Sequence, residues 1–558
     1  MISRLRAGLI SSALILLTAC AARGGEIRSV RFSTTGDLPA SLLSGGSLLE
    51  KGAALSDSLL DLEMLRIDSL CFSRGRLAAA VGIDTLAAAG GVDVRIAVDE
   101  GEWTRIGSVA VTGSSAVSPV EKEEILSLRR GGRFLPADLE RALGRLLEFY
   151  NGSGYPFAQV WLTGFEFDEE TNEVDLAISI FEGETSVVSD VSFRGLSGTD
   201  SSFALKLTRV RIGSAFDERS VAGGREYLRA SGLFGRVGEP IVEQIGKGTV
   251  GLVYPVEELE RNNLFQGGFG VSQKDGDDYV LSGAVDLVLR NIAGRGRNAD
   301  LSWVNNGERY SRLELSYSEP FVFSTPVGLD ARIGQIVQDS VYVYHSAGLF
   351  LGYPLGPRFT VKAGASADRN VPEGGELVRS IRQRYRLGIA KGSGTRFNLE
   401  FHVEGAYKRS YLEGGDRETD KQLLYRFECD FRIPLFYGTG IFWRVVSESV
   451  FSSKDIHAAE TYALGGAASL RGYRESQFRG ERIAYTNFEY WFGEEGALFI
   501  FDDVGAFYRP DEGWNVKNGL GFGLRSSSPV GVVALSFGLG DQISLRGTRI
   551  HISLSERF

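Results

Sequence analysis

The chain has 558 residues, of which 43% are hydrophobic and 24% charged, and its formal net charge is −10. This length predicts several folding units, and the negative charge argues against nucleic acid as a partner. Beyond the N-terminus no stretch is apolar for the roughly 18 residues that a membrane helix needs. That excludes a helical membrane protein but not a barrel, whose strands alternate apolar and polar residues.

Residues 1–19 are predicted to be a signal peptide, because two arginines precede a short apolar run from Ala7 to Leu17. The next residues, Thr18-Ala19-Cys20, complete a sequence that resembles a lipobox, in which Cys20 would become the lipidated N-terminus of the mature chain. Cleavage near Ala22, which would discard Cys20, is the alternative. Both readings predict export. The other two cysteines fall in different predicted domains, so no disulfide framework is indicated.

Residues 26–257 contain a weak internal repeat. The sequence Asp99-Glu100-Gly101-Glu102 is matched 82 residues later by Phe181-Glu182-Gly183-Glu184, and both precede a strand-like segment. A third, weaker unit ends at Glu257, 75 residues after Glu182. The repeat therefore predicts domains at residues 26–101, 102–183 and 184–257.

Each unit has the pattern strand, helix, helix, strand, strand. The second unit is clearest, because apolar residues recur at helical spacing after Pro136, a residue favoured at helix starts. Its expected elements are strand 106–111, helices 120–128 and 136–150, and strands 157–163 and 174–181. In the first unit we expect a helix at 59–72 and strands at 77–83 and 92–98, and in the third a helix at 216–228.

From Leu264 onward, runs of roughly 10 residues alternate apolar and polar side chains between turns rich in Gly, Asp, Asn and Ser. Sixteen such runs predict a transmembrane barrel over residues 264–558, and an even strand number returns both barrel ends to the side of the repeats. The expected strands are 264–273, 279–290, 296–306, 309–318, 326–337, 341–351, 358–367, 380–390, 395–407, 422–432, 437–450, 481–492, 496–508, 516–526, 529–540 and 545–558.

The loop between the eleventh and twelfth expected strands contains Leu470-Arg471-Gly472-Tyr473. Two acidic strand positions, Glu489 and Asp503, follow within 32 residues of Arg471. An arginine inside a barrel needs such partners, because an unpaired buried charge is prohibitive. A surface loop whose arginine points into water is the alternative.

This loop resembles the Leu-Arg-Gly-Tyr/Phe loop of the BamA/TamA superfamily of outer-membrane assembly factors, which folds back into the barrel lumen. With the first strand running outward, the loop is the sixth external one, the position that the family's motif occupies. The segment Phe501 to Gly505 is similar to the family's Phe-x-Asp-x-Gly strand. The resemblance implies a lumen motif of Leu470, Arg471, Gly472 and Tyr473, with Glu489, Asp503 and Gly505 as its partners.

The three repeats resemble the POTRA module, the periplasmic domain of the same superfamily. The turns at 289–296 and 319–321 are also similar to the family's, and the last residue, Phe558, matches its C-terminal targeting signal, although Glu556 departs from it. Three repeats look closer to the TamA branch than to BamA, and lipidation at Cys20 resembles lipoprotein variants of that branch. The resemblance implies a bacterial outer-membrane location, with the repeats in the periplasm.

The function implied is assembly of outer-membrane proteins: POTRA domains receive unfolded clients, and the barrel promotes their insertion. Glycines in the first barrel strand favour a weak seam that offers a template edge. The implied partners are client proteins, outer-membrane lipids and a TamB-like periplasm-spanning protein, and phospholipid transport stays open. Alternatives are a two-partner secretion transporter of the same fold or a passive porin, and the repeats could be mere spacers.

No catalytic residue, cofactor or metal site is expected. The four histidines are scattered, and neither a Ser-His-Asp set nor metal-ligand spacing occurs. Glu489 and Asp503 could be mistaken for a general acid/base pair. We interpret them instead as carboxylates that hold the Arg471 guanidinium by charge-assisted hydrogen bonds.

Overall fold

The computed structural model describes residues 25–259, 263–273, 279–305, 310–338, 341–391, 396–457, 460–493, 497–528, 531–541 and 548–555. The predicted signal peptide, Cys20 and Phe558 lie outside these ranges. Within them, every helix is too short or too polar to cross a lipid bilayer.

Residues 25–101, all of them described, form a small sheet covered by helices. The elements are β1 (Ile27–Thr34), α2 (Ala40–Ser44), α3 (Asp57–Ser73), β2 (Ala80–Ala88) and β3 (Gly91–Asp99). The central β3 is parallel to β1 and antiparallel to β2. Ile67 and Cys71 of α3 pack against Ile96 of β3, and all three are at most 1% exposed. This apolar face fixes α3 on the sheet.

The second domain repeats this arrangement. Its elements are β4 (Arg105–Thr112), α4 (Pro119–Leu126), α5 (Pro136–Gly152), β5 (Gln159–Asp168) and β6 (Glu173–Phe181), with sheet order β4-β6-β5. Ser118 and Glu121 form a capping box at the start of α4, and Pro136 opens α5 as expected. Leu146 and Tyr150 of α5 are buried against Ile178 of β6.

The third domain adds one short strand to the pattern. Its elements are β7 (Val187–Arg194), α6 (Ser201–Thr208), α7 (Glu218–Ala230), β8 (Phe234–Val237), β9 (Ile241–Gly246) and β10 (Thr249–Glu258), with sheet order β7-β10-β8 and β9 also paired with β10. The Tyr254 hydroxyl donates a hydrogen bond to the Val221 carbonyl at 2.9 Å, which ties α7 to β10. The pattern of strand, two helices and closing strands is therefore present in all three domains.

A glutamate at the end of the last strand closes each domain. Glu100, Glu182 and Glu258 accept backbone N–H groups, at 2.8–3.1 Å, from the loop after the first strand of their own domain. The donors are Asp37 and Leu38 for Glu100, Ser115 and Ala116 for Glu182, and Ser197, Gly198 and Thr199 for Glu258. We call these three residues the closing glutamates.

Hydrogen bonding keeps the closing glutamates ionised. Burial opposes the charge on Glu182, but hydrogen bonds from the Ser115 hydroxyl and the Ala116 N–H outweigh it and lower the pKa of Glu182 to about 2. The pKa values of Glu100 and Glu258 are lowered against burial in the same way.

The third closing glutamate is Glu258, whereas the sequence repeat pointed to Glu257. The carbonyl of Val256 meets Gly195 in the same way as the carbonyl of Ile180 meets Gly113. The glutamate two residues after each carbonyl reaches the loop, and in the third domain that residue is Glu258. Elsewhere, β2 begins at Ala80 rather than near 77, and β5 runs to Asp168 rather than 163.

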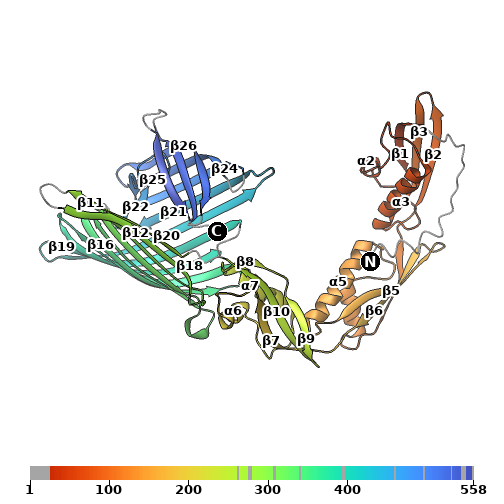
Figure 1. The fold of residues 1–558 in the computed structure, drawn as a ribbon, viewed down its shortest axis with the longest axis horizontal. Coiled ribbons are helices and arrows are strands. Elements are labelled where there is room, and N and C mark those ends of the chain that lie inside the picture. Colours follow the sequence, from red (N-terminus) through yellow and green to blue (C-terminus); the bar gives the residue numbers. More distant parts are fainter. Residues whose placement is uncertain are drawn as a thin grey trace. The chain divides into compact units, whose positions relative to one another are not determined.

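The rest of the chain forms an antiparallel sheet that has sixteen strands among the described residues and curls over on itself (Figure 1). Fourteen of the fifteen connections between successive strands of this sheet are short, and the connection between β21 and β24 is a long loop. The predicted sixteen-stranded sheet is confirmed, with most strand ends moved by a few residues. The strands are β11 (Leu264–Gln273), β12 (Tyr279–Ile292), β13 (Arg297–Asn305), β14 (Tyr310–Glu319), β15 (Gly328–Gln338), β16 (Tyr342–Pro354), β17 (Phe359–Pro372), β18 (Leu377–Lys391), β19 (Phe397–Leu412), β20 (Arg417–Pro434), β21 (Gly440–Phe451), β24 (Arg482–Phe492), β25 (Leu498–Arg509), β26 (Gly513–Ser528), β27 (Gly531–Leu539) and β28 (Arg549–Ser555).

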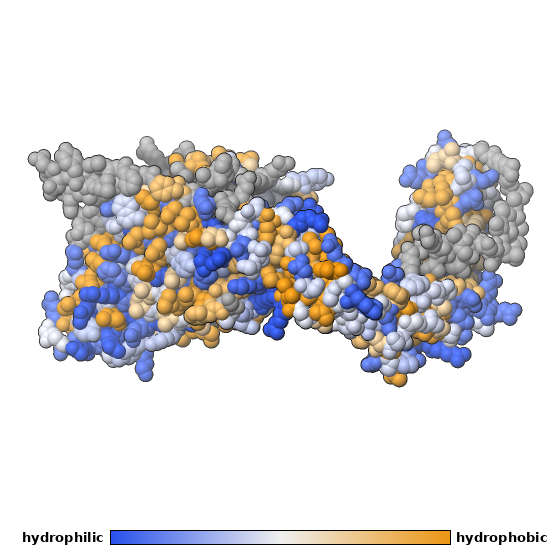
Figure 2. All heavy atoms as spheres, turned by 60° about the horizontal axis from the view of Figure 1, so that its bottom comes forward, coloured by the Kyte–Doolittle hydropathy of each residue, from blue (hydrophilic) through white to orange (hydrophobic). Residues whose placement is uncertain are grey.

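The two faces of this sheet differ in chemistry, because successive side chains along a strand point to opposite sides. One face, the lumen face, carries buried charged residues such as Arg382 and Glu404. The other, the outer face, exposes large apolar residues such as Leu349 and Leu387, at 59% and 63%. Figure 2 shows apolar residues gathered in broad patches on the side of the sheet that it displays.

The third domain is docked onto two turns of the sheet. Asn291, before the β12–β13 turn, donates a hydrogen bond to the Thr199 hydroxyl at 2.9 Å. Gly294, with a φ of +71°, lies so close to Gly198 that a side chain would collide with its carbonyl oxygen. The rings of Phe203 and Phe321, the latter in the β14–β15 turn, make an edge contact at 5.7 Å. These two turns therefore mark the end of the sheet that faces the third domain.

Candidate functional site

The candidate site is the long loop between β21 and β24. A short hairpin of β22 (Tyr462–Leu464) and β23 (Phe478–Gly480) frames it. Inside the hairpin, Gly465, Gly466 and Gly472 have φ values of +121°, +98° and +95°. These left-handed conformations, which suit glycine, turn the chain so that the segment 464–473 lies against the lumen face.

Arg471 is held between two strands of the lumen face. Its Nε and Nη2 donate to the two carboxylate oxygens of Asp503 on β25, both at 2.7 Å, and its Nη1 donates to Glu489 of β24 at 2.5 Å. The backbone N–H of Arg471 also donates to Asp503, at 3.0 Å. Asp503 is fully buried, and Arg471 and Glu489 are 6% and 5% exposed. The arginine is thus satisfied by the two carboxylates named from the sequence.

Two further residues, Phe501 and Arg525, contact this ion-pair network. Its guanidinium carbon lies 3.7 Å from the ring centre of Phe501, a cation–π contact. Arg525 of β26 donates to the second oxygen of Glu489 at 2.8 Å. The sequence indicated Phe501 only as part of a family-like segment. Two arginines and two carboxylates form one network in which Arg525 is partly exposed and the other three are buried, so removal of Arg471 would leave Asp503 without a side-chain counter-ion.

Close backbone contact between the loop and two strands depends on glycines. A side chain at Gly519 of β26 would collide with the Arg471 carbonyl oxygen, and one at Gly538 of β27 with the Gly472 backbone. Gly505 of β25, named from the sequence, lies under the buried side chains of Leu464 and Leu470. The lumen face is therefore shaped to receive this loop.

Tyr473 and Gly472 extend the contact to the last strands. The Tyr473 hydroxyl donates to the Asn518 carbonyl at 2.9 Å and lies 2.8 Å from a carboxylate oxygen of Asp541. The Gly472 N–H donates to Nε2 of His551 on β28 at 3.1 Å. Sequence reasoning missed His551 and Asp541, since nothing in the spacing of a single histidine or a turn aspartate marks such a partner.

A second attachment of the same loop, also missed from the sequence, lies on the opposite part of the sheet. Glu460, 6% exposed, accepts hydrogen bonds from Lys408 of β19 at 2.7 Å and from the Ser380 hydroxyl of β18 at 3.1 Å. Earlier in the loop, the Ser452 hydroxyl donates to Asp420 of β20 at 2.6 Å. One segment is thus bonded to β18–β20 at its start and to β24–β28 at its centre, so the loop crosses the lumen as a strap.

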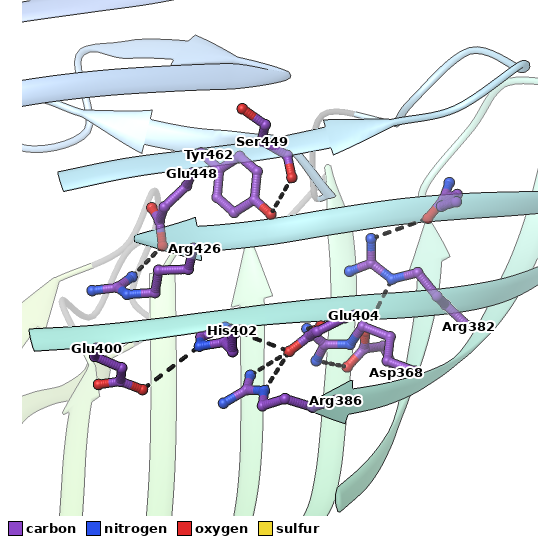
Figure 3. A network of polar contacts seen from close by, with 12 residues as sticks. Asp368, Arg382, Arg386, Glu400, His402, Glu404, Arg426, Glu448, Ser449 and Tyr462 are labelled. Atoms are coloured by element: carbon purple, nitrogen blue, oxygen red, sulfur yellow. Dashed lines mark hydrogen bonds and ion pairs between the residues drawn. The ribbon is translucent and has the colours of Figure 1, made fainter. Parts of the chain in front are cut away.

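The lumen face next to Glu460 carries its own ion-pair network (Figure 3). Asp368 accepts from Arg382 at 3.1 Å and from Arg384 at 2.8 Å. Glu404 accepts from Arg384 at 3.2 Å and from Arg386 at 2.5 Å. These charges come from β17, β18 and β19 and compensate one another, so this wall is a fixed surface.

The interactions of this site attach the loop to the lumen face of the sheet. Arg471 and its partners contain no activated nucleophile, and the described residues hold no cluster of three or more His, Cys, Asp or Glu suited to a metal. All acidic groups around Arg471 are already engaged by arginines. The arrangement can hold a loop in place and release it when the ion pairs break.

The chain was compared with known proteins. Residues 104–183, the second domain, match the POTRA family model, described as a surface antigen variable number repeat. Over 531 residues, 87% of the chain, it is 23% identical to the "Outer membrane protein assembly factor BamA" of Nitratidesulfovibrio vulgaris. The second domain thus matches the POTRA family, and most of the chain is similar to an outer-membrane assembly factor of the BamA type. Relatives of this type lie in the outer membrane with their POTRA domains in the periplasm.

Two other similarities were found, one in sequence and one in fold. A "Putative outer membrane protein assembly factor" of Treponema pallidum is 22% identical over 266 residues, 47% of the chain. The chain spans 65% of the length of the first relative and 31% of the second. The solved structure of CdiB from Escherichia coli is similar in fold, with a TM-score of 0.50 and 15% identity over 89% of this chain and 98% of that one.

Proposed function

We propose that this chain promotes the assembly of other barrel proteins in the outer membrane. The observation that carries the proposal is the loop strap: a buried Arg471 held by Glu489 and Asp503 inside a sixteen-stranded sheet that follows POTRA domains. A loop that crosses the lumen narrows the water-filled channel that a porin keeps open. An assembly factor needs a sheet that keeps its shape while its first and last strands meet a client.

The POTRA domains would receive the client as an extended segment. In the first domain β2 is an edge strand of the sheet, and in the second β5 is. An edge strand offers unpaired N–H and C=O groups to which an extended peptide can add. The third domain, docked on the sheet through Asn291 and Gly294, would then deliver the segment to the barrel.

The free-energy cost of unpaired backbone groups in the membrane defines what the barrel must do. Each unpaired backbone group costs several kcal/mol in hydrocarbon, so a client strand has to stay paired as it enters the membrane. The strands at the two ends of the sheet order, β11 and β28, are the natural template, and client folding supplies the free energy.

The proposal is tested with the full chain reconstituted into liposomes and a urea-denatured barrel client, whose folding is followed by heat-modifiability on gels. We expect faster client folding than in empty liposomes, and slower folding with Arg471→Ala. Deletion of residues 185–256 should impair folding more than deletion of 26–99, because the third domain contacts turns of the sheet. Equal rates with and without the protein would refute the proposal.

A second candidate function is export of one soluble client by two-partner secretion, which the fold similarity to CdiB favours. The two functions differ in where the product is found: an inserted barrel stays in the membrane, whereas an exported client reaches the medium. A wide and steadily open pore in single-channel recordings would instead indicate a porin.

The TamA-like branch, the TamB-like partner and phospholipid transport are finer proposals. Co-purification of a TamB-like protein from native membranes would support them. Its absence, with clients still bound, would favour a BamA-like role.

A further inference from the structure

A hollow of about 420 Å³ lies across strands β13 to β18 of the sheet. This volume falls within the roughly 300–1,000 Å³ of typical small-molecule sites. Most of its lining is apolar, from Leu301, Leu315, Ile333, Ala347, Ala367 and Ile381. Two alanines on neighbouring strands, flanked by leucine and isoleucine, leave the space that larger side chains would fill.

The register of the sheet places this hollow on the outer face. Ile333 of β15 pairs with Ala347 of β16, which pairs with Ala367 of β17, so the three side chains share one side. Two residues further along β16, on the same side, Leu349 is 59% exposed. The buried charges Asp368 and Arg382 occupy alternate positions, so their side chains point the other way and Asp368 lines the hollow only with its backbone. The hollow therefore opens toward the membrane.

Cations lie along one edge of the hollow. Ile381, which lines it, pairs with Arg369 on one side and with Arg409 on the other. The two arginines are therefore about 10 Å apart across two strand spacings. Both are exposed.

Three more exposed cations extend this edge over β18–β20: Arg379, Arg417 and Lys421. In the described part of the chain, none of the five has a carboxylate within ion-pair distance. Tyrosines support three of them, with Arg379 lying 4.4 Å and Arg417 5.5 Å from the ring centre of Tyr411, and Arg409 5.3 Å from that of Tyr407. We call these five cations the basic edge.

The basic edge lies at the end of the sheet away from the third domain. That domain contacts the β12–β13 and β14–β15 turns. Since each hairpin reverses direction, the β17–β18 and β19–β20 turns, which flank the basic edge, are at the opposite end. This end faces the outer leaflet, because the POTRA domains are periplasmic.

We propose that the hollow and the basic edge together bind a lipid of the outer leaflet that carries an anionic, phosphate-containing headgroup. Acyl chains occupy the hollow over Ala347 and Ala367, and the phosphate lies between Arg369 and Arg409. Charge complementarity decides the occupant: the basic edge lacks carboxylate partners where the apolar hollow ends, so its ligand is apolar at one end and negative at the other. This site depends on the membrane location but not on client assembly.

The test uses the purified full chain in detergent and native mass spectrometry with added phosphatidylglycerol or phosphatidylcholine of identical acyl chains. We expect the wild type to retain the anionic lipid preferentially. Near a membrane surface each Lys or Arg contributes about 1 kcal/mol of attraction, which is roughly a fivefold change in affinity per charge. Arg369→Gln/Arg409→Gln should therefore weaken phosphatidylglycerol binding by roughly 25-fold and leave phosphatidylcholine unchanged.

Two matched control variants change a residue of β17 or of the turn before it. Arg358 is exposed in the β16–β17 turn at the opposite end, so Arg358→Gln removes a charge without touching the site. Ala365 is exposed one outward position away from Ala367 and outside the hollow. Ala367→Trp should reduce binding of both lipids by filling the hollow, whereas Ala365→Trp should not.

Equal binding of the two lipids by the wild type would overturn the proposal. So would an equal loss with Arg358→Gln, which would indicate only a general effect of charge. Heat-modifiability of each variant shows that its barrel is folded, so a loss of binding cannot be assigned to misfolding.

Discussion

Replacement of Arg471 by alanine is the sharpest test of the loop strap. The change removes three charge-assisted hydrogen bonds, two to Asp503 and one to Glu489. Glu489 keeps Arg525, but Asp503, fully buried, keeps only the backbone N–H of residue 471 among the bonds from the motif. Removing one partner of a buried ion pair typically costs about 3–5 kcal/mol, because the remaining charge is left uncompensated.

This magnitude predicts the behaviour of the loop. If the loss is expressed as opening of the loop, the open population rises about 150- to 5,000-fold. The amides of residues 464–473 should then exchange with deuterium faster by a similar factor, measured by mass spectrometry on the full chain in detergent. Strand amides of β18–β20 should keep their protection, since their ladder is independent of Arg471.

The matched control is Arg474→Ala, an exposed arginine three residues further on with no carboxylate partner in the described structure. Arg471→Lys should recover little, because an ammonium cannot reproduce the planar fork that bridges Glu489 and Asp503. Unchanged exchange at 464–473 in Arg471→Ala, together with intact client folding, would refute the reasoning: Arg471 would then not hold the loop.

Four further predictions follow from other parts of the chain. Lys408→Met, which leaves buried Glu460 without its counter-ion, should speed exchange at residues 452–457 and 460–463, and adding Glu460→Gln should recover part of the loss. Glu182→Gln should destabilise the second domain at neutral pH; because the folded pKa is depressed to about 2, this difference should shrink as pH falls from about 4.5 toward 2, as followed by hydrogen exchange. Gly294→Val should cost roughly 1–3 kcal/mol at the joint with the third domain and broaden spin-label distances across it, while distances within the sheet stay sharp. Cys20→Ser should abolish fatty-acid labelling and leave the barrel heat-modifiable; labelling that persists would exclude lipidation at Cys20.

The sheet could be predicted because its strands alternate with a period of two over most of its length, and turns separate them. The candidate site was harder to predict than the sheet. Arg471, Glu489 and Asp503 could be grouped because an arginine inside a barrel requires carboxylates. Glu460 and Lys408 carry no such local signal: they are 52 residues apart, and only the path of the loop brings them together.

The repeat shows where pattern reasoning stops short. It located Glu100 and Glu182 but pointed to Glu257 instead of Glu258, because these two glutamates are adjacent and only the fold shows which of them reaches the loop. Similarly, the five residues of the basic edge look in the sequence like ordinary charged residues of separate strands. Its members meet only when four strands are set side by side.

The closing glutamates have a consequence for how such chains change in length over evolution. Each carboxylate and the N–H groups that satisfy it belong to the same domain, so a segment copied from the first strand to the glutamate carries both halves of the contact. Such a copy can be gained or lost without leaving a buried polar group unsatisfied in its neighbours. A duplication boundary between the first loop and the glutamate would leave either the carboxylate or the backbone N–H groups without their partners. The contact thus defines the natural unit of duplication and allows relatives to differ in the number of domains ahead of a common barrel.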